Sequence, residues 1–145
     1  MEKIKFSIFI EAPVEKVWNT MLDDETYRKW TTPFHPGSYY KGGWNKGDRI
    51  QFLSPEGDGM FSRIADNRQY EFISIEHLGI IKNGAEDTDS EEAKKWAPAH
   101  ENYIFAKKGE GTELTVEVET NQEYKDMFED MWPKSLQILK ELSEK

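Results

Sequence analysis

Apolar residues first recur at every second position, which is the spacing of a half-buried β-strand. Between residues 3 and 11, the apolar residues at this spacing are Ile4, Phe6, Ile8 and Ile10. Pro13 ends this strand, because proline suits the first turn of a helix. Apolar residues then recur at helical spacing up to Leu22, and Asp23 or Asp24 can cap a second short helix that ends at Trp30. The chain is thus predicted to open with one strand and two short helices.

Turn-forming residues divide residues 38–120 into short runs that are rich in β-branched and aromatic side chains. This pattern predicts a meander of antiparallel hairpins, with strands over residues 39–44, 48–54, 59–66, 70–79, 99–107 and 112–120. Residues 82–97 form a long loop in which Thr88 and Glu91 have the spacing of a capping box, so we expect a short helix there. The charge run of this loop is interpreted as a solvated surface.

The longest helical pattern covers residues 122–145. Its apolar stripe consists of Tyr124, Met127, Phe128, Met131, Leu136, Ile138, Leu139 and Leu142. Such a stripe needs a surface to cover, so we expect the helix to lie on the sheet. Pro133 removes one backbone donor, which predicts a bend between Glu129 and Pro133 unless the helix begins after that point. Together these elements predict an α+β protein.

Length and composition narrow the class of protein. A chain of 145 residues corresponds to one domain, and we expect a single domain over residues 1–145. The absence of cysteine excludes disulfides, cysteine-ligated metals and a thiol nucleophile. No apolar run has the length of a signal peptide core or a membrane span, so we expect a cytoplasmic protein without membrane insertion.

The charge of the chain bears on its partners. The net charge is −9, from 28 acidic and 19 basic residues, and the basic residues are scattered along the chain. A protein that binds nucleic acid usually gathers lysine and arginine on one face, because the phosphate backbone carries the affinity. We therefore expect no nucleic-acid partner.

The three histidines offer little catalytic pattern. His35, His77 and His100 are dispersed, so neither a metal site nor a cofactor is predicted. His77 shares a strand face with Ile73 and Ile75, which predicts that it points into the protein interior. There it is a weak candidate for acid–base chemistry, and a structural histidine that is hydrogen-bonded at the end of a strand is the preferred interpretation. The sequence identifies no partner base or nucleophile for it.

The other polar residues that could carry chemistry are interpreted as structural or solvent-exposed. His100 and Glu101 follow Pro98 and are interpreted as a pair at the start of a strand rather than a catalytic dyad. The acidic residues of the last predicted strand alternate with apolar ones, which places the carboxylates on its solvent side: Glu113, Glu117 and Glu119. No glycine cluster follows a strand and opens a helix, so nothing predicts nucleotide binding.

Short motifs along the chain resemble those of a known superfamily. They are A-P-x-x-x-V-W at residues 12–18, Trp30, residues 34–38, G-W-x-x-G at residues 43–47, residues 111–116 and W-x-x-x-L-x-x-L-K from Trp132 to Lys140. In this order they resemble the SRPBCC or START-like superfamily, and in particular the branch related to the activator of the 90 kDa heat-shock protein ATPase (AHSA-like).

The resemblance implies a helix-grip fold. In that fold, a curved antiparallel sheet of about six or seven strands wraps around a long C-terminal helix and leaves an apolar cavity between them. The positions that match the lining of the cavity are Trp30, Phe34, Phe52, Met60, His77, Tyr103, Met127 and Met131. Among them, the hydroxyl of Tyr103 is suited to orient a ligand.

Three functions remain open at this stage. The leading hypothesis is a protein that binds a small hydrophobic molecule in the cavity and catalyses no reaction. The second is a modulator of a chaperone ATPase, or another interaction protein, that works through its outer surface. The third is a cyclase-like or hydrolase-like enzyme that uses His77 or Tyr103 inside the cavity. Both a monomer and a homodimer are compatible with the sequence.

Overall fold

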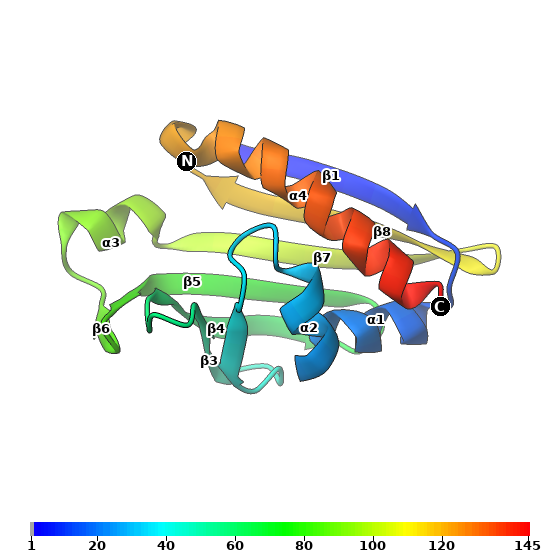
Figure 1. Cartoon of the computed structure of the whole chain (residues 1–145), viewed down its shortest axis with the longest axis horizontal. Helices are drawn as coiled ribbons and strands as arrows, with labels where there is room; N and C mark the ends of the chain where they lie inside the picture. The colour runs from blue at the N-terminus through cyan, green and yellow to red at the C-terminus, as the bar shows by residue number, and fades with distance from the viewer. Residues whose placement is uncertain (1) are drawn as a thin grey trace.

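The computed structural model describes residues 2–145, and it contains one sheet and four helices over that range (Figure 1). In chain order the elements are β1 (Glu2–Ile10), α1 (Val14–Leu22), α2 (Asp24–Trp30), β2 (Tyr39–Gly42), β3 (Arg49–Leu53), β4 (Gly59–Arg68), β5 (Phe72–Lys82), β6 (Ala85–Asp87), α3 (Glu91–Trp96), β7 (Ala99–Lys108), β8 (Gly111–Thr120) and α4 (Gln122–Ser143). The predicted helix-grip α+β fold is confirmed.

The strands form one curved antiparallel sheet in the order β1-β8-β7-β5-β4-β3-β2, with β6 paired to β5. The eighth strand, β6, was not predicted, because it has only three residues and they carry no alternating apolar pattern. In Figure 1, α4 runs along one face of the sheet, and α1 and α2 lie next to it on the same side. The inward side chains of the strands and helices form the main core on that side.

The helix in the long loop begins later than the sequence predicted. Ser90, rather than Thr88, caps α3, and its side-chain oxygen accepts a hydrogen bond from the Ala93 amide at 3.1 Å. The carboxylate of Asp87 accepts hydrogen bonds from the amides of Asp89 and Ser90, each at 3.0 Å. This local turn occupies the residues before Ser90 and sets the first helical residue at Glu91.

The C-terminal helix is continuous through Pro133. Its buried face passes through Trp132, Leu136 and Leu139, whereas Met127 is 38% exposed. One residue along a helix turns the side chain by about 100° around the axis, so Met127 points away from the direction taken by its neighbour Phe128. The prediction that Met127 and Met131 face inward is therefore wrong: the inward positions are the next residues along the helix, Phe128 and Trp132.

Asn121 links the start of α4 to the end of α3. Its side-chain oxygen accepts a hydrogen bond from the Tyr124 amide, and its side-chain nitrogen donates to the Lys95 carbonyl at 3.0 Å. We expect Asn121→Ala to lower the free energy of unfolding by about 1 kcal/mol, because a helix cap is lost. Urea unfolding measures the change. Gln122→Ala, at the exposed first helical position, serves as the control and leaves the stability within about 0.5 kcal/mol.

Candidate functional site

A cavity of about 400 Å³ lies between the sheet and α4. Its walls come from the inner faces of β3, β4, β5, β7 and β8, from α1, α2 and the segment 31–38, and from α3 and α4. Most of the lining side chains are apolar, and many are aromatic. This volume and lining are typical of pockets that enclose small organic molecules.

Six of the eight residues expected at the cavity line it: Trp30, Phe34, Phe52, Met60, His77 and Tyr103. Met127 and Met131 are not part of the lining, and α4 contributes Phe128 and Trp132 instead. The spacing of four residues between Tyr124, Phe128 and Trp132 is the sequence signal that identifies this face. The apolar stripe predicted for residues 122–145 also contained Met127 and Met131, so it was too wide to show which side of the helix faces the cavity.

Trp132 lies at the centre of an aromatic cluster. Its ring centroid is 4.9 Å from that of Phe34, 6.1 Å from Tyr103, 6.2 Å from Phe6 and 6.3 Å from Trp30. Trp30 is held in turn by its indole N–H, which donates to the Met21 carbonyl at 3.0 Å. Because these contacts join α2, the segment after it, the sheet and α4, the cluster gives the cavity a rigid aromatic wall.

A histidine–carboxylate pair lies on the sheet wall of the cavity. His77 of β5 is opposite Ala99 of β7, so Glu101, two residues further along β7, is its diagonal neighbour on the same face. His77 Nε2 and Glu101 Oε1 are 3.1 Å apart, and both side chains are largely buried. His100 and Glu101 both lie at the start of β7, and their side chains make separate contacts on opposite faces of the sheet. The spacing of two between Glu101 and Tyr103 was the signal that placed Glu101 on the inner face.

Two hydroxyl groups extend this pair. His77 Nδ1 is 2.7 Å from the hydroxyl of Ser62, and the hydroxyl of Tyr103 donates a hydrogen bond to Glu101 Oε2. A change of register between Phe61 and Ser62 in β4 aligns Ser62 with His77. An ionised carboxylate only accepts, so Nε2 of His77 donates to Glu101, and in the neutral ring Nδ1 accepts from Ser62. Four side chains from three strands thus form one chain of hydrogen bonds.

The environment of this network raises the pKa of two tyrosines. Burial, followed by the negative charge of Glu101, raises the pKa of Tyr103 well above its ordinary value. The same two causes, in the same order, raise the pKa of Tyr27, which lies on α2 across the cavity. Both hydroxyls therefore stay protonated at neutral pH, and that of Tyr103 donates its proton to Glu101.

Among the buried side-chain nitrogen and oxygen atoms of the cavity residues, one has no hydrogen-bond partner within residues 2–145. It is Nε1 of Trp44, a buried indole N–H. The ring of Trp44 packs against those of Tyr40 and Phe52, at 5.2 and 5.9 Å between centroids. A buried donor without an acceptor costs free energy, so this N–H lowers the stability of the fold.

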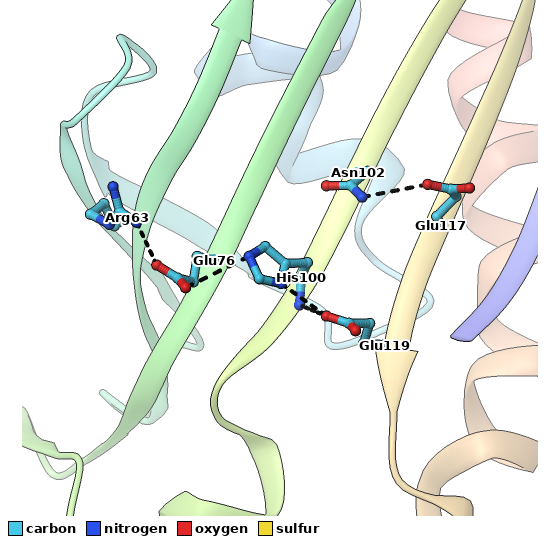
Figure 2. Close-up of polar contacts among 6 residues, drawn as sticks. All are labelled: Arg63, Glu76, His100, Asn102, Glu117 and Glu119. Carbon is cyan, nitrogen blue, oxygen red and sulfur yellow. Dashed lines mark hydrogen bonds and ion pairs between the residues drawn. The ribbon is translucent and has the colours of Figure 1, made fainter. Parts of the chain in front are cut away.

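The opposite face of the sheet carries a separate row of polar side chains (Figure 2). His100 Nδ1 is 2.9 Å from Glu119 Oε1, and its Nε2 is 3.6 Å from Glu76 Oε2. Arg63 donates to Glu76 at 2.7 Å. Partial burial acts to raise the pKa of Glu119, but hydrogen bonds from the amide and ring of His100 outweigh it and lower the pKa. Glu117 and Glu119 lie on the outer face, as predicted.

Two further searches of the described residues bear on the site. Within residues 2–145, no group of three or more histidine, aspartate or glutamate side chains is placed to hold a metal ion. Over the same residues, no helix combines the length and the apolar character that crossing a membrane requires.

Comparison with known proteins finds a matching sequence family. The profile of a family described as "Activator of Hsp90 ATPase homolog 1-like protein" matches residues 11–144. No curated protein matches the chain.

Several solved structures share its fold. The crystal structure of MLL2253 from Mesorhizobium loti has a TM-score of 0.77 at 12% identity and covers 97% of this chain and 96% of its own. The solution structure of the Aha1 dimer from Colwellia psychrerythraea has a TM-score of 0.73 at 19% identity, over 99% and 97% of the two chains. The crystal structure of CalU16 from Micromonospora echinospora has a TM-score of 0.68 at 16% identity, over 97% and 75%. At these identities the likeness establishes the fold.

Proposed function

We propose that this chain, which belongs to the family of Activator of Hsp90 ATPase homolog 1-like proteins, binds a small hydrophobic molecule in the cavity between its sheet and α4. The observation that carries the proposal is the cavity of about 400 Å³ with its aromatic walls. Removing apolar surface from water yields about 25 cal/mol per Å², so a ligand that buries a few hundred Å² gains several kcal/mol before the costs of association.

Polar groups in the wall supply selectivity. The network of His77, Glu101 and Tyr103 presents a carboxylate and a hydroxyl at one side of the cavity. A few polar groups in an otherwise apolar pocket orient a ligand without contributing most of its affinity.

Filling the cavity tests the proposal. We expect Met60→Trp to weaken binding of the neutral apolar fluorophore N-phenyl-1-naphthylamine by about tenfold or more, because the larger ring occupies the space that the probe needs. A fluorescence titration measures the dissociation constant, and circular dichroism confirms the fold.

Met127→Trp is the matched control for this variant. It makes the same change on the exposed surface of α4, outside the cavity lining, and should bind the fluorophore like the unchanged protein. If both variants bind the probe with unchanged affinity, or if the unchanged protein fails to bind it, the cavity does not take up apolar molecules and the proposal is wrong.

A second function is favoured by the pair of His77 and Glu101. A histidine hydrogen-bonded to a carboxylate in the wall of a largely apolar cavity is a group that can transfer protons, and it supplies the second residue that the enzyme hypothesis lacked. In that case His77→Ala would abolish turnover of a bound substrate and leave its affinity unchanged. The hydroxyl of Ser62 is fully buried outside the cavity lining, so it positions His77 and does not act as a nucleophile.

The chaperone hypothesis rests on the family's description alone. It requires contacts through the outer surface, so stimulation of a chaperone ATPase would persist in Met60→Trp. The dimer of the Colwellia protein makes a homodimer a candidate assembly for this chain as well. Sedimentation equilibrium distinguishes it from a monomer.

A further inference from the structure

We propose that the molecule bound in the cavity is an apolar compound that carries a protonated amine, and that Glu101 binds the amine. This inference rests on the proposed function, because it names the chemistry of the ligand for the same cavity. It requires that the cavity favour positive over negative charge, and that Glu101 have room for one more donor.

The charged groups along the cavity wall favour a cation. Among the described residues that line it, none is lysine or arginine, and the carboxylates are those of Asp58, Glu101 and Glu119. Glu119 turns its carboxylate to His100 on the opposite face of the sheet (Figure 2), and Asp58 is exposed in the turn between β3 and β4. Glu101, whose side chain is 19% exposed, is therefore the carboxylate of the inner wall.

No permanently charged side chain neutralises Glu101. Within residues 2–145, its ion-pair partner is His77 alone, which is charged only when protonated. The hydrogen bonds from His77 and Tyr103 occupy one site on each oxygen. A carboxylate has about four acceptor sites, so sites for further donors remain. A largely buried carboxylate gains more from a cation than from a neutral donor, since the low dielectric strengthens their attraction.

The surrounding rings add to the same preference. The aromatic residues Tyr27, Trp30, Phe34 and Trp132 belong to the cavity lining. Aromatic faces attract cations through the ring quadrupole, by about 0.5–2 kcal/mol in desolvated sites. After burial, the negative charge of Glu101 is the second cause that raises the pKa of Tyr27 and Tyr103.

The same cavity disfavours an anionic amphiphile. A fatty acid or an aryl sulfonate would place its negative charge in a cavity without lysine or arginine and next to a carboxylate. The net charge of −9 also disfavours its approach at low ionic strength. The cavity therefore discriminates between apolar molecules of the same shape by the charge of their polar group.

Three probes of matched shape test this inference: 4-butylbenzylamine, 4-butylbenzyl alcohol and 4-butylbenzoate, which at neutral pH are cationic, neutral and anionic. Isothermal titration calorimetry measures each affinity. We expect the amine to bind about tenfold more tightly than the alcohol, and the benzoate to bind most weakly. In Glu101→Gln the amine should fall to the affinity of the alcohol. Glu117→Gln, which removes a carboxylate from the outer face, should leave all three affinities unchanged.

The outcomes separate the inference from the proposed function. If the alcohol binds but the amine binds no more tightly, or the benzoate binds as well as the amine, the cavity takes up ligands and the inference is overturned. If none of the three probes binds, the proposed function fails and the inference fails with it. If Glu101→Gln does not fold, the ranking of the three probes on the unchanged protein still decides the question.

Discussion

Replacing Trp132 with alanine is expected to lower the free energy of unfolding by about 3–5 kcal/mol, the usual range for losing a large aromatic side chain from a core. Trp132 is 3% exposed, and its ring contacts those of Phe6, Trp30, Phe34 and Tyr103. These partners come from separate elements that cannot close over the space together. The loss therefore includes the cost of a cavity as well as the burial of the ring.

Urea unfolding followed by far-ultraviolet circular dichroism measures this change. Trp96→Ala is the matched control. Trp96 is only half-buried and stacks on Tyr124 at 4.0 Å between centroids at the edge of the molecule, so its loss should be clearly smaller. A loss below about 1 kcal/mol for Trp132→Ala would contradict the central place given to this ring.

The second large effect is a loss of stability at alkaline pH. Burial, followed by the charge of Glu101, raises the pKa of Tyr27 and Tyr103 in the folded protein above the unfolded value of about 10. Below about pH 10 both tyrosines are protonated in both states, so their contribution to stability is fully present. As the pH rises further, the unfolded chain loses these protons while the folded chain keeps them, until the folded pKa is reached.

The size of this effect follows from linkage. Each tyrosine that stays protonated only in the folded state lowers the free energy of unfolding by about 1.4 kcal/mol per pH unit. At about pH 11, the two together should cost roughly 3 kcal/mol relative to neutral pH. Urea unfolding at several pH values between about 8 and 11.5 measures the slope.

Tyr27→Phe tests the assignment of this slope. The variant lacks one of the two ionising groups, so its alkaline slope should be shallower by about 1.4 kcal/mol per pH unit. Other groups that titrate in this range affect both proteins equally and cancel in the comparison. An unchanged slope would mean that Tyr27 ionises as readily in the folded protein as in the unfolded chain.

The sequence predicted most elements of the fold, and particular residues explain why the cap of α3 and the strand β6 were not predicted correctly. Alternating isoleucines in β1 and glycine-rich turns along the meander are local signals, so the strands were found within a few residues. The cap of α3 was misplaced, because the carboxylate of Asp87 binds the amides of Asp89 and Ser90 in a local turn that delays the start of the helix. The strand β6 has no pattern of its own and exists because β5 provides a partner.

The candidate site was predicted less completely than the fold. The resemblance implied that Phe52, Met60 and Tyr103 line the cavity, and alternation along the strand turned His77 inward; all four are part of the lining. On α4 the stripe spanned several adjacent directions, and the choice of Met127 and Met131 over Phe128 and Trp132 was wrong by one residue. Whether the lining residues bind a ligand stays a prediction.

The sequence by itself determined the class of elements, their order and the family, because periodicity, turn residues and short motifs are local properties of the chain. Only the tertiary structure decided that Ser62, His77, Glu101 and Tyr103 form one network. Their meeting depends on the register of β4, β5 and β7 and on the change of register at Ser62. Register is set by how all inward side chains pack together, so pairings between distant strands arise only when the whole sheet and α4 enclose the same space.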